Sequence, residues 1–347
     1  MSAALQYVDE RDRGGAAQPM LIARELVRHF KVKGAGKGAV VRAVDGVSFT
    51  LFKGETLGVV GESGCGKSTL ARVLLHLVVP DSGELVFDGD QVADAHGISV
   101  ADLRRQVQMV FQDSYASLNP RMPVQDSVAF GPLMNGRSRA ESRRVAQDIL
   151  VKVGLRPDLF GPRYPHELSG GQKQRVNIAR ALAIGPRMVI LDEAVSALDK
   201  SVEAQVLNLL RALKRTLNLT YLFISHDLNV VRYISDRVLV MYLGQVVELG
   251  PASQVFAATR HPYTRALLGS RLSMDASNRI EQPPLVGDPP SPINPPSGCR
   301  FRTRCPHAEP VCEARMPMLG EWEDRGSHVA ACHMTDPASG HSLAGTA

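Results

Sequence analysis

Residues 61–69 read GESGCGKST, which fits the pattern G-x-x-x-x-G-K-[ST]. The pattern has its required context, because the apolar run TLGVV at 56–60 precedes it and the helix-like run TLARVLLHL follows it. Glycines at 61, 64 and 66 let the backbone bend so that successive N–H groups point at a phosphate, at the positive end of the helix. The stretch therefore predicts a phosphate-binding loop between a strand and a helix.

The side chains of this loop have separate expected roles. Lys67 would supply a point charge to the β- and γ-phosphates, and the Ser68 hydroxyl would be a ligand of Mg²⁺. Cys65 occupies a variable position, so we interpret it as incidental rather than redox active. The alternative is a glycine-rich turn that binds nothing. The expected nucleotide contacts of the loop are Gly61, Glu62, Ser63, Gly64, Cys65, Gly66, Lys67, Ser68 and Thr69.

Two carboxylates end a second apolar strand in RMVILDEAVSALD at 187–199. Such a pair is costly at the end of a buried strand unless a cation meets it. Asp192 would hold Mg²⁺, and Glu193 would orient the attacking water as a general base. In YLFISHD at 221–227, His226 follows another strand and could donate to the γ-phosphate. The alternatives are two solvated acids and a structural histidine.

The stretch ELSGGQKQRVNIARALAIGP at 167–186 predicts a second anion site. Ser169 can cap a helix from about Gln172 to Ile184, and Gly170 and Gly171 leave the amides of its first turn uncovered. The two expected anion sites, the loop at 61–69 and the start of this helix, lie far apart in sequence. We expect that each one is completed by the other kind of site on a second molecule.

The remaining pattern alternates strands and helices. Strands are expected at 188–192 and 221–225 with a helix at about 202–217 between them, which indicates a parallel sheet with crossover helices. A helical insertion that begins at Ser138, with Glu141 at capping-box spacing, lies between the sheet-forming regions. RVLVMYLGQVVELG is typical of a hairpin that turns at Gly244.

Composition and charge exclude several classes. The 347 residues have an ordinary composition and a net charge of +5 that is spread along the chain, so a nucleic-acid-binding arm is not expected. No apolar run approaches the roughly 18 residues of a membrane span, and the N-terminus lacks the apolar core of a secretory signal. We expect a protein of the cytoplasm, where structural disulfides are rare.

Together these motifs resemble the ATP-binding cassette of ABC transporters over about residues 21–270. The resemblance implies an α/β fold with a RecA-like parallel core, an antiparallel β subdomain and a helical subdomain at about 113–180. It also implies that two cassettes pair head to tail, with ATP between this P-loop and the partner's LSGGQ. It makes Gln112, in MVFQD, a γ-phosphate and Mg²⁺ sensor, and Phe30 the aromatic on adenine, although an aromatic that ends a strand is usually packing. The remaining expected nucleotide contacts are Ser169, Gly170, Gly171, Gln172 and Asp199.

A narrower resemblance is to the ATP-binding subunits of dipeptide and oligopeptide permeases, specifically the second of their two ATPases. FQDSYASLNPRM, VSALDKSVEAQVLNLL, HPYTRALL and GDPPSPINPPSGC carry it, although Ala194 stands where that family has proline. It implies a motor on the cytoplasmic face of the inner membrane, with a second cassette subunit, two membrane permeases and, indirectly, an extracytoplasmic binding protein. The alternative is a soluble ABC-type ATPase in regulation, translation or repair, which would generally carry tandem cassettes or a coiled coil. The expected divisions are a tail at 1–20, the cassette at 21–270, a Pro-rich linker at 271–298 and a cysteine segment at 299–347.

Four of the five cysteines, Cys299, Cys305, Cys312 and Cys332, lie in the last fifty residues. Their spacing lacks the C-x2-4-C pairs of structural zinc sites, and disulfides conflict with a cytoplasmic protein. A polar tail with Arg300, Arg302 and Arg304 offers little interior for free thiols. Spacing alone leaves zinc and a [4Fe-4S] cluster equally open. The resemblance to peptide permeases implies the cluster, with the arginines offsetting its charge, as a structural staple or a redox sensor.

Overall fold

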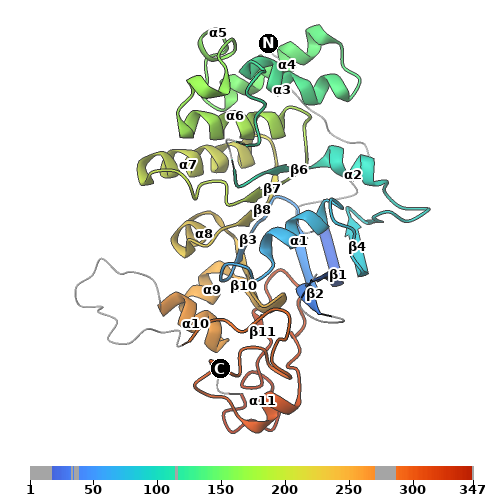
Figure 1. The fold of residues 1–347 in the computed structure, drawn as a ribbon, viewed down its shortest axis with the longest axis vertical. Helices are drawn as coiled ribbons and strands as arrows, with labels where there is room; N and C mark the ends of the chain where they lie inside the picture. Colours follow the sequence, from blue (N-terminus) through green and yellow to red (C-terminus); the bar gives the residue numbers. More distant parts are fainter. Residues whose placement is uncertain (1–17, 33, 35–38, 114–115, 270–286, 346–347) are drawn as a thin grey trace.

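The computed structural model describes residues 18–32, 34, 39–113, 116–269 and 287–345 (Figure 1). Most of the expected tail at 1–20 and more than half of the expected linker at 271–298 therefore lie outside the described residues.

The core is a seven-stranded sheet in the order β11-β10-β9-β3-β8-β7-β6. Its five parallel strands are β6 (Val107–Val110), β7 (Met188–Asp192), β8 (Thr220–Ile224), β3 (Thr56–Val60) and β9 (Arg237–Tyr242). β10 (Gln245–Pro251) joins β9 through the predicted hairpin at Gly244, and β11 (Val329–Ala330) pairs antiparallel with β10. The parallel sheet expected from the alternation of strands and helices is thus present.

Alternate residues of the parallel strands face two separate apolar layers. Met188 and Ile190 of β7 belong to the layer that includes α1 (Lys67–Leu74) and the second sheet, whereas Val189 and Leu191 belong to the layer that includes α6 (Gly170–Leu182), α7 (Lys200–Thr216) and α8 (Leu228–Ile234). A strand buried on both faces reads as a continuous apolar run, as MVILD does. The two layers hold the carboxyl ends of the strands in place.

A second, antiparallel sheet has the order β2-β1-β4-β5. Its strands are β1 (Pro19–Lys31), β2 (Val40–Phe52), β4 (Ser82–Phe87) and β5 (Asp90–Gln91), and α2 (Val100–Gln106) leads from it into β6. The strands on the two sides of the Lys-Gly-Glu turn at 53–55 therefore belong to different sheets, β2 to this one and β3 to the core.

Helices gather at one end of the molecule (Figure 1). They are α3 (Val124–Met134), α4 (Arg139–Lys152), α5 (Pro157–Phe160), the 3₁₀ turn Pro165–Glu167 and α6. The predicted capping box is confirmed, because the Ser138 side chain accepts from the N–H of Glu141 while the Glu141 carboxylate accepts from the N–H of Ser138. Val145 and Ile149, on one face of α4, are buried.

The C-terminal segment, residues 287–345, lies at the opposite end in Figure 1 and packs on the core through β11. α9 (Ala252–Ala257) and α10 (Pro262–Gly269) precede it, and α11 (Pro310–Ala314) lies within it. Phe301 is 2% exposed against the core, and Nε2 of His328 lies 2.8 Å from Oε1 of the buried Glu248. The segment thus shares the interior of the seven-stranded core.

We expect low pH to destabilise the packing of residues 287–345 on the core, because it favours protonation of His261. The ring is buried beside Phe301, and burial lowers its pKa to about 4. Between about pH 6.5 and 4 the unfolded chain binds a proton at this position that the folded chain excludes, so the free energy of unfolding falls as the pH drops through this window. Urea unfolding at pH 7 and pH 5 should show a smaller pH effect for His261→Asn than for the wild type. The exposed His166→Asn is the control, and an unchanged pH effect in His261→Asn would refute the prediction.

Candidate nucleotide-binding site

The glycine-rich loop follows β3 and turns into α1. Gly61, Gly64 and Gly66 have φ angles of 152°, 78° and 111°, which side chains rarely tolerate. A Cβ on Gly66 would lie 1.9 Å from the carbonyl oxygen of Ala43, and one on Gly61 would lie 2.3 Å from that of Met241. The backbone can follow this path only because these positions are glycine.

Lys67 lies inside the loop. Its side chain is buried, and Nζ donates to the carbonyl oxygens of Gly61 at 2.7 Å and Glu62 at 3.0 Å. The Cys65 thiol is buried as well, 3.8 Å from this ammonium, and burial raises its pKa. Cys65 is therefore packed within the loop, which agrees with its interpretation as incidental.

Asp192, at the end of β7, meets the first turn of α1. Its carboxylate is 3% exposed and accepts from the Ser68 hydroxyl over 3.1 Å. Burial raises the pKa of Asp192, and nearby Glu193 adds to the shift. A buried carboxylate beside a hydroxyl is a set of hard oxygen donors, so these two residues fit Mg²⁺.

Glu193, Gln112 and His226 lie together beside the loop. Gln112 Nε2 donates to Glu193 Oε2 over 2.8 Å, and His226 Nδ1 lies 3.5 Å from Glu193 Oε1. The φ of Glu193 is 48°, a left-handed value that is uncommon for a residue with a side chain, and its N–H donates to Ile224 O of β8. The three residues come from the ends of neighbouring strands β6, β7 and β8, which explains why residues so distant in sequence converge.

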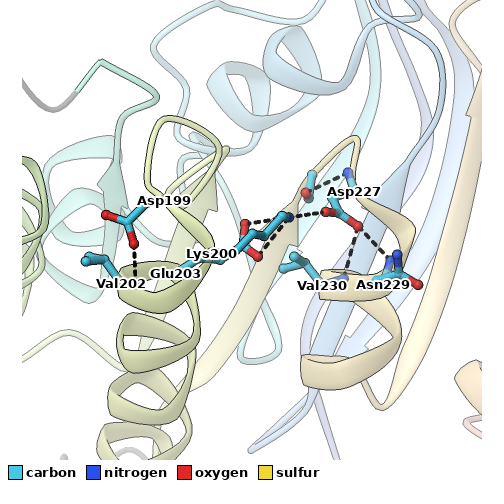
Figure 2. A network of polar contacts seen from close by, with 8 residues as sticks. Asp199, Lys200, Val202, Glu203, Asp227, Asn229 and Val230 are labelled. Carbon is cyan, nitrogen blue, oxygen red and sulfur yellow. Dashed lines mark hydrogen bonds and ion pairs between the residues drawn. The ribbon is translucent and has the colours of Figure 1, made fainter. Parts of the chain in front are cut away.

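A polar network fixes the turn that carries His226 (Figure 2). Lys200 Nζ lies 3.0 Å from Glu203 Oε1 and 2.9 Å from Asp227 Oδ2, so it ties the start of α7 to the start of α8. Asp227 also caps α8 by accepting from the N–H of Asn229. Asp199, one of the expected nucleotide contacts, caps α7 through the N–H of Val202.

A pocket of about 540 Å³ brings residues 63–64 and 66–69 of the loop together with Phe30, Gln112, Glu193 and His226. Phe30, at the end of β1 and 36% exposed, borders it, and the Arg28 guanidinium lies 4.9 Å from the centre of the Phe30 ring. The lining residues are Phe30, Val41, Ala43, Ser63, Gly64, Gly66, Lys67, Ser68, Thr69, Gln112, Glu193 and His226.

The LSGGQ stretch is not part of this pocket lining. Ser169 caps α6 through the N–H of Gln172, and the Gln172 side chain accepts from the N–H of Ser169, as the capping prediction requires. Gly171 faces α7, where an added Cβ would lie 2.4 Å from Val202. The uncovered start of α6 and the P-loop are therefore two separate surfaces of one chain.

The prediction of a [4Fe-4S] cluster at Cys299, Cys305, Cys312 and Cys332 is wrong. In the described part of the chain, no group of three or more His, Cys, Asp or Glu side chains is arranged to hold a metal ion, so zinc finds no site either. The four thiols are free and border one cavity of about 10 Å³. Burial raises the pKa of Cys299 to about 12 and that of Cys332 to about 11, whereas a metal ligand must be a thiolate.

The reason for this error is the interior that the cassette supplies. We expected a polar tail without room for free thiols, but Cys312 is 7% exposed and Phe301 2%. Each of the nearby arginines also has a carboxylate partner of its own. Arg300 pairs with Asp45, Arg302 with Glu313 and Arg304 with Glu62.

Two residues contact the loop that the sequence did not assign to it. The Tyr263 hydroxyl accepts from the N–H of Glu62 over 2.9 Å, and Arg304 binds the Glu62 carboxylate. Tyr263 lies in HPYTRALL, a motif that indicated the family without indicating a contact. Arg304 lies in the cysteine segment, where only the folded chain reveals its partner.

A strand, a glycine-rich loop, a helix and a strand-end carboxylate that meets the helix define a P-loop nucleotide-binding protein. Residues 44–196 match the family model described as ABC transporter, and residues 247–312 match that of the oligopeptide/dipeptide transporter C-terminal region. The chain is 47% identical to the putative oligopeptide transport ATP-binding protein YkfD of Bacillus subtilis, over 91% of this chain and 95% of the relative. It is 46% identical to the oligopeptide transport ATP-binding protein AppF of the same organism, over 91% and 98%.

Solved structures give the same fold. The cassette cbiO1 of Clostridium perfringens, part of the ABC transporter complex cbiONQ, has a TM-score of 0.60 and 29% identity, over 69% of this chain and 91% of that chain. A dimeric post-hydrolysis state of the cassette MJ0796 bound to ADP and Pi has a TM-score of 0.59 and 27% identity, over 67% and 99%. The chain belongs to the ATP-binding proteins of ABC transporters, and the predicted α/β P-loop cassette is confirmed.

Proposed function

We propose that this chain is the ATP-hydrolysing subunit of an ABC importer that carries oligopeptides. The observation that carries the proposal is the convergence of Glu193, Gln112 and His226 at the mouth of the P-loop pocket. The oligopeptide/dipeptide transporter C-terminal region and the printed names of the relatives support peptides as the cargo. The chain is an ATPase, as the match to the ABC transporter family indicates.

The P-loop side of the site would bind the phosphates of ATP. Lys67 and the N–H groups of the loop supply positive charge, and Phe30 offers a ring to the adenine. Ser68, Asp192 and Gln112 would hold Mg²⁺, which neutralises phosphate charge when it is bound. Their hydroxyl, carboxylate and amide oxygens suit that ion.

Glu193 would orient and polarise the attacking water. Its carboxylate lies within hydrogen-bonding reach of Gln112 and near His226, so its direction is fixed by two neighbours. His226 would donate to the γ-phosphate. Ala194 follows Glu193 where the family has proline, and both carboxylates, Asp192 and Glu193, are still present.

The second half of the site would come from another cassette. Ser169, Gly170, Gly171 and Gln172 lie on a surface separate from the P-loop, which suits binding the γ-phosphate of a partner's nucleotide, and Asp199 caps the neighbouring helix α7. Closure of two cassettes around ATP would pull on two permease subunits.

None of the helices in the described ranges is long and apolar enough to cross a membrane. We place the chain on the cytoplasmic face of the inner membrane, bound to those permeases and served by an extracytoplasmic peptide-binding protein.

The soluble alternative, an ABC ATPase in regulation, translation or repair, is not favoured. The relatives that match over nine tenths of the chain are named as transport ATP-binding proteins. The C-terminal region that the chain shares with oligopeptide/dipeptide transporters points the same way.

The test is reconstitution of the complete complex into liposomes. We expect peptide-loaded binding protein to raise ATP turnover, and peptide to accumulate in the lumen only when ATP is present. The same liposomes with an amino acid or a sugar in place of the peptide are the control. ATP turnover without accumulation of any peptide would refute the assigned cargo while leaving the ATPase intact.

A further inference from the structure

Glu62, the second residue of the P-loop, is held from three sides. Its carboxylate accepts from Arg304 twice, with Nη1 2.8 Å from Oε2 and Nη2 3.1 Å from Oε1. Its N–H donates to the Tyr263 hydroxyl over 2.9 Å, and its carbonyl accepts from Lys67 Nζ over 3.0 Å. Glu62 therefore links Lys67, whose ammonium we expect at the phosphates, to Tyr263 and Arg304, which lie far outside the loop motif.

The ion pair between Arg304 and Glu62 is largely shielded from water. The Arg304 side chain is 5% exposed and that of Glu62 is 22% exposed. Bidentate pairing of guanidinium and carboxylate fixes an orientation as well as a distance, and screening by salt is weak for such a buried pair. The pair can therefore hold the direction of the loop at residue 62.

An aromatic cluster fixes the position from which Arg304 acts. Phe301 of the same turn packs against both Tyr242 of β9 and Tyr263 of α10, with ring centres 5.4 Å away in both cases, while the two tyrosine rings lie 4.6 Å from each other. All three rings are buried. Because Phe301 anchors the turn of residues 299–304, Arg304 is held beside the P-loop and does not have to be ordered when nucleotide binds.

A second arginine of this turn also reaches the loop, through one intermediate. Arg300 donates to Leu243 O and pairs with Asp45, and the adjacent Gly244 N–H donates to Cys65 O of the loop over 2.8 Å. Arg302 differs, because it pairs with Glu313 inside the C-terminal segment at 3.2 Å. The turn thus carries two arginines directed at the P-loop and one that is not.

We infer that Arg304 is a positioning residue for the P-loop: its pairing with Glu62 holds the loop open to phosphate, so the C-terminal segment sets the affinity for MgATP. The inference rests on the proposed ATP-binding function. Glu62 occupies an unspecified position of the loop motif, so the motif itself gives its side chain no role.

The experiment compares R304Q with the matched control R302Q in the full-length chain. Titration with MgATP should give a dissociation constant roughly tenfold higher for R304Q and within about twofold of wild type for R302Q. In the assembled complex, R304Q should raise the KM for ATP while kcat at saturating ATP changes by less than about twofold. A residue that only stabilises the fold would lower the melting temperature without this split.

A partner variant keeps the test decisive. E62Q should weaken MgATP binding as R304Q does, and the double variant should be no weaker than either single one, because both remove the same interaction. R304K, which keeps the charge but lacks the planar pair of donors that binds both carboxylate oxygens, should lie between R304Q and wild type. If R304Q does not fold, E62Q decides alone. Equal affinity of folded R304Q, E62Q and R302Q would overturn the inference, whereas a wild type that does not bind MgATP would instead refute the proposed function.

Discussion

Glu193→Gln should reduce ATP turnover at this site by about 10²- to 10⁴-fold, the contribution typical of a positioned general base. Glutamine keeps the shape of the side chain and can still contact Gln112, but it cannot take a proton from water. Binding of MgATP should persist, because the substitution leaves Lys67, Ser68 and Asp192 unchanged. The measurement is phosphate release by the purified complex under single-turnover conditions, together with MgATP binding by the isolated chain.

The matched control is Glu84→Gln, which removes a carboxylate from an exposed pair with Arg24 on β1 and β4. It should leave phosphate release unchanged. Near-wild-type phosphate release by Glu193→Gln would show that another group activates the water and would remove Glu193 from the mechanism.

Arg237→Ala should lower the free energy of unfolding by about 3–5 kcal/mol, because it leaves the Glu55 carboxylate buried without its cation. Arg237 and Glu55 are 2% and 0% exposed and lie 3.3 Å apart, and Arg237 Nη1 also donates to Thr50 O of β2. Among the described residues, Nε and Nη2 of Arg237 have no hydrogen-bond partner, so the polar contacts of the guanidinium are those of Nη1 with Glu55 and Thr50. For a domain of this size the loss corresponds to a melting temperature lower by roughly 10 °C.

Removing both charges tests the reason for this effect. Arg237→Met combined with Glu55→Leu should cost less than Arg237→Ala alone, since no unpaired charge remains in the interior. Arg24→Ala, which breaks an exposed pair, should change the free energy of unfolding by less than about 1 kcal/mol. A melting temperature of Arg237→Ala equal to that of Arg24→Ala would contradict the proposed role of the buried pair.

The order of elements in the core was predictable because local signals agree with the global fold. MVILD is buried on both faces and has no polar residue before its end, and Ser138 and Ser169 each cap the helix that the sequence predicted. The assignment of β2 and β3 to different sheets was not predictable. The turn at 53–55 has the same composition whether the strands that it joins pair with each other or separate, and only tertiary packing decides.

The P-loop side of the site was predictable because each role requires a particular residue type at a fixed spacing. Gly66, Lys67 and Ser68 follow from the loop motif, and Asp192 and Glu193 follow from a strand that ends in two acids. The cysteine segment was not predictable for the opposite reason. Its thiols and arginines have no fixed partner in the sequence, and their surroundings come from β9, β10 and α10 of the cassette.

The central claim, that this chain drives a membrane transporter, is tested most directly by affinity purification of the tagged full-length chain from detergent-solubilised native membranes. Mass spectrometry of the eluate identifies whatever is bound. We expect a second ATP-binding cassette subunit and two multi-span proteins to elute together with the chain. A stable chain that elutes without any multi-span protein, from membranes in which it is normally expressed, would contradict the claim.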